Sequence, residues 1–144
     1  MNILFLNGPN LNLLGTREPD VYGTRTYADL EAYIRSVCGE LGVTCDIFQS
    51  NHEGALIDRI QTAPGTADAI VLNAAAYTHT SVALLDALLA VSLPAVEVHL
   101  SDPMTREDFR HISYCGRACL ATFSGYGFES YRLAAEYIVR NIKI

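Results

Sequence analysis

Five short apolar runs alternate along the chain with segments whose apolar residues recur at helical spacing. We interpret the runs as strands over 3–7, 43–49, 69–73, 95–100 and 118–123. The first run is continuously apolar, as in a strand buried on both faces, whereas the second alternates more, as an edge strand does. Strands that alternate with helices predict a parallel sheet with right-handed crossovers and helices on both faces.

The segments between and after the runs predict four helices, over 26–42, 53–63, 80–91 and 128–142. In the first of them, Thr26 and Asp29 have the spacing of a capping box, and Gly42 suits a helix end. Five strands in 144 residues predict a single α/β domain, 1–144. We expect a flavodoxin-like three-layer fold with a five-stranded parallel sheet in the order 2-1-3-4-5.

The helix predicted over 80–91 has no polar face. From Val82 to Val91 it is apolar all round except for Asp86. Such a helix is normally buried on every side, so we expect an oligomer with this helix at an interface. A charge in an interface needs a partner. Asp86 then either reaches a polar site of a neighbouring subunit or faces residual solvent.

Composition excludes several partners. The formal charge of −6 and the pI of about 5.0 argue against nucleic acid and against an anionic membrane surface. No apolar run has the length of a membrane span, and the N-terminal residues do not resemble a signal peptide. The four cysteines, which form no CxxC motif, fit thiols in a reducing compartment. We therefore predict a cytoplasmic protein.

Polar side chains gather where the predicted strands end. In parallel sheets of this kind, ligands bind beyond the carboxyl ends of the strands. Four of the five predicted strands deliver Asn, His or both to that edge: Asn7, Asn10, Asn51, His52, Asn73, His79 and His99. Their joint placement predicts a polar ligand site at this edge of the sheet.

Glu97 and His99 are the pair most suited to chemistry. Residues at i and i+2 share one face of a strand, so the carboxylate can orient the imidazole for general acid–base work. A histidine satisfied within the core is the alternative. His79 precedes a helix, where capping and anion binding remain equally open, and His52 suits a loop or a cap.

Several other chemistries lack their signatures. Lys143 is the only lysine and the penultimate residue, so a Schiff base in a pocket is not expected. HxxxH and HExxH are absent, so we predict no metal. GxxxxGK[ST], GxGxxG and GxSxG are also absent, which argues against nucleotide hydrolysis, Rossmann dinucleotide binding and α/β-hydrolase chemistry. We expect no bound cofactor. An FMN-binding module with Tyr77 or Tyr126 stacked on the ring is the competing hypothesis. Another hypothesis is a protein that is related to an enzyme and keeps its assembly but has lost its catalytic activity.

The stretch NGPNLNLLGTREPDVYGTRT (7–26) mixes turn formers with two arginines and a tyrosine. This composition predicts a mobile lid at about 15–25, over the ligand edge, that carries Arg17 and Tyr22. With QSNHEG (49–54), AYTHTSVAL (76–84), PAVEVHLS (94–101) and REDFRHISY (106–114), the chain resembles type II 3-dehydroquinate dehydratase. The matching segments span nearly the whole chain in the expected order.

The resemblance implies removal of water from 3-dehydroquinate to give 3-dehydroshikimate through an enolate, without metal or imine, in a dodecamer of four trimers. It implies that Tyr22 is the base, that Arg17 favours the tyrosinate, and that Asn10 holds a water that stabilises the enolate. It also implies that His99, oriented by Glu97, protonates the departing hydroxyl.

The remaining implied positions bind the substrate. They are Asn73 and the Leu100–Ser101 backbone for the carboxylate, and His79, Arg110 and a neighbouring subunit's Asp86 for the rest of the ring. Among the positions that depart from the usual family pattern, Leu85 stands where Arg is frequent, and Asp102 where Asn is common. Asp102 adds a negative charge near the inferred carboxylate site unless its side chain points away.

Overall fold

A computed structural model of the chain describes residues 1–16 and 18–144, with Tyr22 described by its backbone alone. Its centre is a five-stranded parallel sheet in the order β2-β1-β3-β4-β5. The strands are β1 (Asn2–Asn7), β2 (Thr44–Gln49), β3 (Ala69–Asn73), β4 (Ala95–His99) and β5 (Ala121–Ser124). The predicted strand order and the flavodoxin-like arrangement are confirmed.

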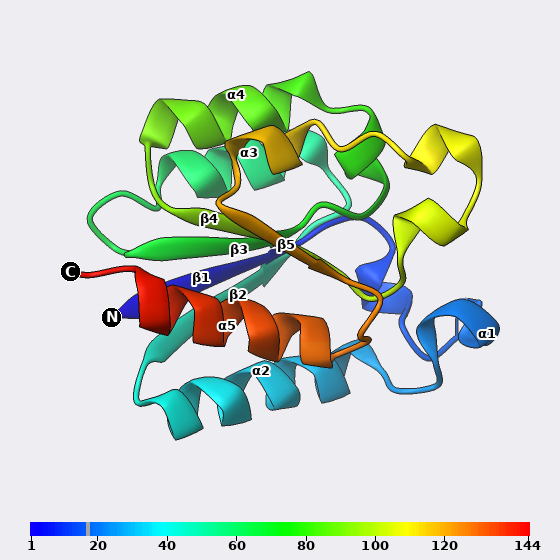
Figure 1. Cartoon of the computed structure of the whole chain (residues 1–144), viewed down its shortest axis with the longest axis horizontal. Helices are drawn as coiled ribbons and strands as arrows, with labels where there is room; N and C mark the ends of the chain where they lie inside the picture. Colours follow the sequence, from blue (N-terminus) through cyan, green and yellow to red (C-terminus); the bar gives the residue numbers. More distant parts are fainter. Residues whose placement is uncertain (17) are drawn as a thin grey trace.

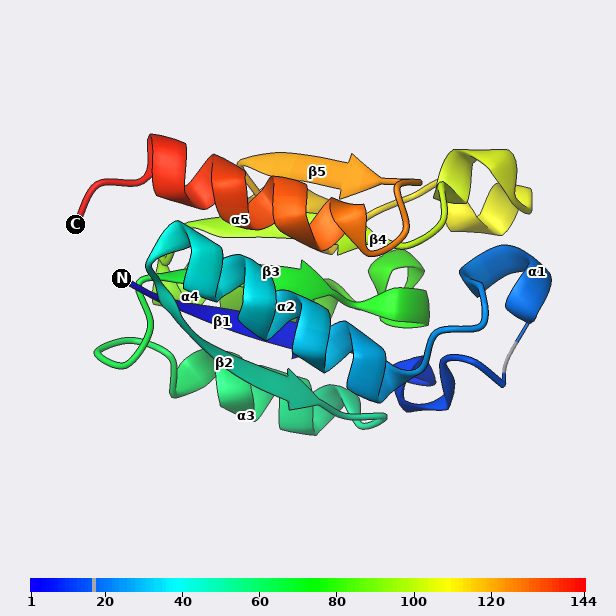
Figure 2. The same cartoon turned by 90° about the horizontal axis from the view of Figure 1, so that it is seen from below.

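Helices cover both faces of the sheet. α2 (Tyr27–Leu41) and α5 (Glu129–Asn141) lie on one face, and α3 (Glu53–Gln61) and α4 (Val82–Val91) lie on the other (Figures 1 and 2). The sequence did not predict the short elements, which are α1 (Pro19–Tyr22) and the 3₁₀ helices η1 (Leu11–Leu13), η2 (Ala75–His79), η3 (Pro103–Thr105), η4 (Asp108–Arg110) and η5 (Cys115–Ala118).

The predicted ends of α2 are confirmed. The Asp29 backbone N–H donates to Thr26 Oγ1 at 3.2 Å, and the Thr26 N–H donates to Asp29 Oδ2 at 2.8 Å. These reciprocal bonds form a capping box and satisfy two donors at the helix start. Gly42 ends the helix with φ of 72°, a left-handed conformation that glycine adopts without strain.

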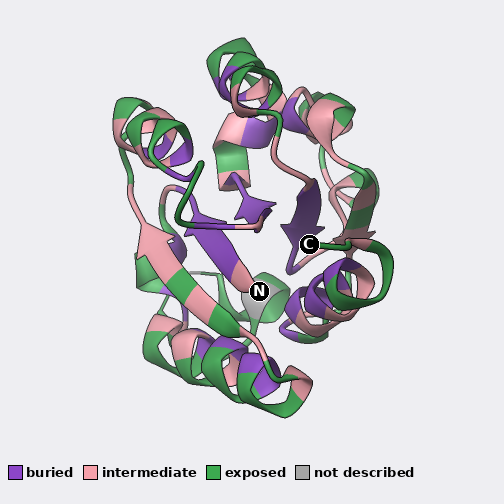
Figure 3. Ribbon diagram, turned by 90° about the vertical axis from the view of Figure 1, so that its left-hand side faces the viewer, coloured by how far each residue is buried: buried purple, intermediate pink, exposed green. Residues whose placement is uncertain are grey.

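The sheet separates two apolar clusters, one under each helical layer. Every residue of β3 and β4 is buried, and β1 is buried from Ile3 onward. The edge strand β2 alternates exposed and half-buried residues, as its sequence predicted. Figure 3 shows this contrast between central and outer strands. The central strands therefore hold their carboxyl ends in fixed positions.

The fifth strand begins later than the sequence suggested. The predicted strand spanned 118–123, whereas β5 spans Ala121–Ser124. The preceding residues close the 3₁₀ helix η5, and the Cys119 thiol donates back to the Cys115 carbonyl at 3.4 Å. Pairing with the sheet starts only where the Leu120 N–H reaches the Ala95 carbonyl at 2.8 Å.

α1 and the 3₁₀ helices η1 to η4 gather at the carboxyl ends of the strands, opposite both chain termini, whereas η5 packs against α4 (Figure 1). This edge carries the loops that follow β1, β3 and β4. Across the described residues, no helix is both long and apolar enough to cross a bilayer.

Candidate active site

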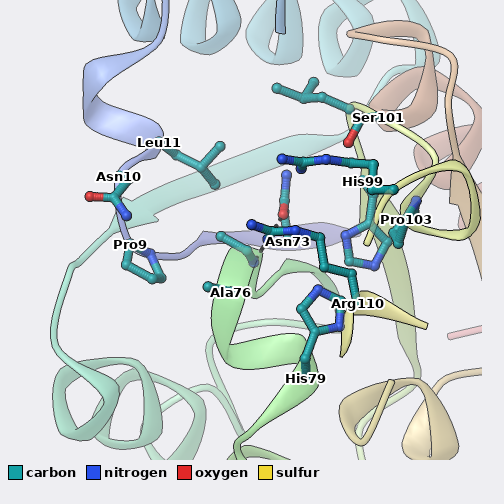
Figure 4. A pocket seen from close by; sticks show the side chains of 13 residues that line it. Pro9, Asn10, Leu11, Asn73, Ala76, His79, His99, Ser101, Pro103 and Arg110 are labelled. Carbon is teal, nitrogen blue, oxygen red and sulfur yellow. Dashed lines mark hydrogen bonds between the residues drawn. The ribbon is translucent and has the colours of Figure 1, made fainter. Parts of the chain in front are cut away.

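A pocket opens at the carboxyl ends of β1, β3 and β4, where the sequence predicted the ligand site. The empty space at this site, counted together with the part that is open to solvent, is about 530 Å³. Figure 4 shows Asn10 on one side, Asn73 in the middle, and His79, His99 and Arg110 on the other side. Of the predicted residues, the pocket is lined by Asn10, Asn73, His79, His99, Leu100, Ser101 and Arg110.

The turn after β1 approaches the end of β3 closely. A Cβ atom on Gly8 would lie 2.5 Å from the Ala74 carbonyl oxygen, so this position excludes every other residue. The chain then reverses at Asn10, whose φ of 69° is left-handed, a conformation that asparagine tolerates better than most residues. The Asn10 N–H donates to Asn51 Oδ1 at 2.9 Å. The turn therefore holds the exposed Asn10 side chain at the rim of the pocket.

Asn73 ends β3 at the bottom of the pocket and is 3% exposed. Its Oδ1 accepts the backbone N–H of Ala75 at 3.2 Å, and its Nδ2 donates to the Tyr131 hydroxyl at 2.9 Å. Both ends of the amide are thus held by the protein. The sequence pointed to Asn73 but gave no sign of its partner in α5.

Glu97 lies behind the pocket wall and is 2% exposed. It accepts hydrogen bonds from His99 Nε2 at 2.9 Å, from Thr122 Oγ1 at 2.9 Å and from the Ser113 hydroxyl. A Cβ atom on Gly116 would lie 2.6 Å from Glu97 Oε1, so only glycine leaves room for this carboxylate. The predicted Glu97–His99 contact is confirmed.

The surroundings of Glu97 keep it ionised. Burial alone would raise the pKa of this carboxyl, but the hydrogen bonds from His99, Ser113 and Thr122 outweigh it and hold the pKa below its usual value. An ionised Glu97 accepts only, so His99 Nε2 must carry a proton. The other ring nitrogen, Nδ1, is then the one available to the pocket.

His79 presents a neutral ring to the same pocket. Its Nδ1 lies 2.7 Å from the Ile112 carbonyl, which only accepts, so Nδ1 carries the proton. Burial, together with the positive charges of His99 and Arg110, lowers the pKa of His79. The ring is therefore neutral at physiological pH, and Nε2 is a hydrogen-bond acceptor rather than an anion-binding cation.

Two arginines supply the positive charge of the pocket. Arg110 Nε donates to Glu107 Oε2 at 2.8 Å, which holds the guanidinium beside His79. Arg106 also lines the pocket, and its Nη2 lies 3.9 Å from Glu18 Oε2 in the loop that precedes α1. Sequence reasoning singled out Arg110 but not Arg106. Arg106 lies in extended backbone between η3 and η4, so no helical spacing in the sequence linked it to Arg110.

Asp102, one of the departures from the family pattern, is not among the residues that line this pocket. Asp102 Oδ1 accepts the Met104 backbone N–H at 3.0 Å and caps η3. The residue lines a neighbouring hollow behind His99 and Arg110, whereas Leu100 and Ser101 line the pocket itself. These contacts favour the second of the two alternatives stated above, in which the side chain points away from the carboxylate site.

Asp86 does not line this pocket, and two further predicted residues cannot be placed relative to it. Asp86 is exposed on the outer face of α4 and is not among the residues that line its own chain's pocket. Arg17 and the side chain of Tyr22 lie outside the described part of the structure, so their pairing stays a prediction. The segment on either side of them, Glu18–Val21 and Gly23–Thr26, is exposed at the same edge of the sheet.

The described residues include no group of three His, Cys, Asp or Glu side chains placed to hold a metal ion. The stacking expected for an FMN module finds no support either. Tyr77 donates its hydroxyl to the Asn51 carbonyl at 2.8 Å, and the residues that line the pocket include neither Tyr77 nor Tyr126. The pocket instead combines an acid–base pair, a neutral acceptor, an amide and two guanidinium groups. This set suits a small anion with hydroxyl groups.

Comparisons with known proteins agree with this chemistry. The family model described as class II dehydroquinase matches residues 1–139. The 3-dehydroquinate dehydratase of Bordetella avium is 56% identical over 142 residues, covering 97% of this chain and 98% of the relative. Catabolic 3-dehydroquinase 1 of Aspergillus terreus is 52% identical over 142 residues, covering 99% of this chain and 93% of the relative. The type II dehydroquinase of Butyrivibrio crossotus superposes with a TM-score of 0.94 at 43% identity, covering 98% of each chain. The chain therefore belongs to the class II dehydroquinase family.

Proposed function

We propose that this chain removes water from 3-dehydroquinate to give 3-dehydroshikimate, in the manner of the relatives whose names state that activity. A base takes the proton alpha to the ketone, an enolate forms, and the hydroxyl at the beta carbon leaves as water. No metal and no imine takes part. The buried Glu97–His99 pair at the wall of the pocket is the observation that carries this proposal.

His99 is the acid in this scheme. The ionised Glu97 holds Nε2 and stabilises the imidazolium form, so Nδ1 can give a proton to the departing hydroxyl on the pocket side. A carboxylate that is buried and bound by three donors resists taking that proton itself. His99 is 8% exposed, which keeps bulk water from competing for the proton.

Tyr22 is the base, and Arg17 is its activator. A free tyrosine has a pKa of about 10, and a cation within about 4–6 Å favours the tyrosinate and lowers that value. A pKa nearer the working pH makes a better general base. The described residues on either side of Tyr22 are exposed at the carboxyl edge of the sheet, and Glu18 Oε2 lies 3.9 Å from Nη2 of the pocket residue Arg106, which supports a place for this segment over the pocket.

The remaining polar groups bind the substrate. Asn10 at the rim holds a water that stabilises the enolate. Asn73 and the Leu100–Ser101 backbone bind the carboxylate. His79 Nε2 accepts a hydrogen bond from a ring hydroxyl, because its ring is neutral, and Arg110 donates to the oxygens beside it.

We further propose that α4 packs against another copy of the chain. Val82 and Leu89 are 49% and 58% exposed on a helix whose only charge is Asp86. Contiguous apolar exposure of this kind marks an interaction surface. In the proposed assembly, the chain forms trimers in which Asp86 enters the neighbour's pocket, and four trimers join. This arrangement covers the exposed apolar side chains of α4 and gives Asp86 a polar site. Sedimentation velocity tests this assembly, and a stable monomer at working concentration would contradict it.

Turnover tests the proposed reaction directly. Purified protein mixed with 3-dehydroquinate should produce the ultraviolet absorbance of a conjugated enone. Borohydride added with substrate should leave the activity intact, because no imine forms. Assembled protein without turnover would refute the reaction, and inactivation by borohydride would refute the absence of an imine.

A further inference from the structure

A chain of buried hydrogen bonds runs from the pocket into the core. Asn73 Nδ2 donates to the Tyr131 hydroxyl at 2.9 Å, and that hydroxyl donates to Asn7 Oδ1 at 2.7 Å. Asn7 Nδ2 continues to the Tyr27 hydroxyl at 3.4 Å. The members come from β3, α5, β1 and α2, so four elements distant in sequence meet at one point below the pocket.

The contact of Asn73 with Ala75, at the pocket end, fixes which atom donates and which accepts in each of these hydrogen bonds. The Ala75 backbone N–H can only donate, and it donates to Asn73 Oδ1 at 3.2 Å. The amide nitrogen of Asn73 therefore faces Tyr131. Because the Tyr131 hydroxyl must accept there, its own proton goes to Asn7. One of the two Asn73 amide protons is used in this way, which leaves the second for a ligand.

Packing alone does not explain the Tyr131 hydroxyl. The residue is 1% exposed, and its ring stacks on Phe5 with centroids 6.4 Å apart. A phenylalanine ring would make the same contact. A buried polar network replaced by apolar groups of the same shape is often equally stable, so its stability contribution is a weak reason for its presence. The partners of the hydroxyl are the amides that end β1 and β3, and Asn73 lines the pocket.

We propose that Tyr131 is a positioning residue that holds Asn73 as a hydrogen-bond donor to the carboxylate of the substrate. This inference rests on the proposed function. A loose Asn73 amide could rotate and turn its oxygen toward the carboxylate, which would repel it. Tyr131 and Ala75 together prevent that rotation. Burial raises the pKa of Tyr131, so the hydroxyl keeps its proton at any working pH.

The test compares Tyr131→Phe with Tyr137→Phe in the same helix. Tyr137 packs its ring on Phe123, away from the pocket. In Tyr131→Phe, the KM for 3-dehydroquinate should rise about tenfold, as expected for one lost hydrogen bond to a charged group. The kcat should stay within about threefold and its pH profile should not move, because the acid–base groups are untouched. Tyr137→Phe should change neither constant.

A second variant, Asn7→Leu, removes the acceptor at the far end of the chain. The Tyr131 hydroxyl then has no partner for its proton except Asn73, so the KM should rise here too. A KM unchanged in both folded variants, or a lower kcat with the KM unchanged, overturns the inference. Failure of the wild-type protein to turn over 3-dehydroquinate is a different result, because it refutes the proposed function itself.

Discussion

The two sides of the pocket differ in how they are held. On the β4 side, Glu97 and His99 are buried, and Glu97 is bound by side chains from three separate segments. On the β1 side, Asn10 is exposed, and the segment that carries Arg17 and Tyr22 is exposed in the residues described around them. Asn10 and Glu18 also have positive φ values on this side.

This difference matches the different structural requirements of the acid and of the base. The acid His99 must be held in one orientation by a carboxylate that stays ionised, which requires a fixed, buried set of partners for Glu97. The base must let substrate in and then exclude water, which requires a segment that can move. Substitutions on the two sides should therefore differ in their effects on rate and on stability. Those on the loop should cost rate alone, and those behind β4 should cost rate and stability together.

The largest effect should follow Tyr22→Phe. Loss of a general base costs between about 10² and 10⁴ in rate, so we expect kcat to fall by that range. The melting temperature should stay within a degree or two, because the described residues on either side of Tyr22 are exposed and substitutions in exposed segments change stability little. Steady-state kinetics and calorimetry check both parts. Tyr126→Phe, at a tyrosine that is 62% exposed, is the matched control and should behave as wild type.

A smaller loss of rate, accompanied by a loss of stability, should follow Glu97→Gln. The amide group of Gln replaces one of the two oxygens, so it points a donor either at Thr122 or at Ser113 and His99, which already donate, and it no longer carries the negative charge beside His99. We expect kcat to fall about 10²-fold and the free energy of unfolding to fall by about 3 kcal/mol.

Glu40→Gln is the control for that substitution, because Glu40 is an exposed carboxylate bound to Arg132. Exposed pairs contribute at most about 1 kcal/mol, and this one is far from the pocket. If Glu97→Gln lowered the rate with no loss of stability, the contrast between the two sides would fail.

The smallest effect, and the most diagnostic for pH, should follow Thr122→Val. This change removes one donor to Glu97 while it keeps the side-chain shape, so the free energy of unfolding at pH 7 should fall by about 1–2 kcal/mol. The folded pKa of Glu97 is lowered, so its contribution is present above the unfolded value of 4.5 and is lost as pH falls through the folded value. The cost of Thr122→Val should therefore shrink in acid.

Urea unfolding at neutral and acidic pH measures that change. Thr44→Val is the control, since Thr44 Oγ1 donates to the neutral oxygens of Met1 and Asn2. Its cost should not depend on the Glu97 carboxyl. If the cost of Thr122→Val were the same at both pH values, the ionised state assigned to Glu97 would be wrong.

Sequence pattern predicted the parts of the fold that depend on local periodicity. Strand alternation predicted the sheet, and the capping pair Thr26 and Asp29 marked the start of α2. The beginning of β5 was misplaced, because the apolar residues near Cys119 also suit the 3₁₀ turn that they form. Short 3₁₀ helices have no strong periodic signal, so η1 to η5 were not predicted.

The site residues likewise fall into those that a local sequence pattern predicted and those that it did not. The contact between Glu97 and His99 followed from the two-residue period of a strand, and the structure confirms it. The roles of Arg17 and Tyr22, and of Asp86 from a neighbour, rest on the family resemblance and stay predictions. Arg106 was missed because its place in the pocket depends on how η3 and η4 fold over the sheet edge.

The sequence by itself determined the layered sheet, the edge at which the polar residues meet and the family, because each is written in local periodicity or in contiguous motifs. Only the tertiary structure decided the partners of those polar residues. Thr122 reaches Glu97 across 25 positions, and Tyr131 reaches Asn7 across 124. No local pattern encodes such pairs. They arise when packing brings separate elements together and each buried polar group takes the partner within reach.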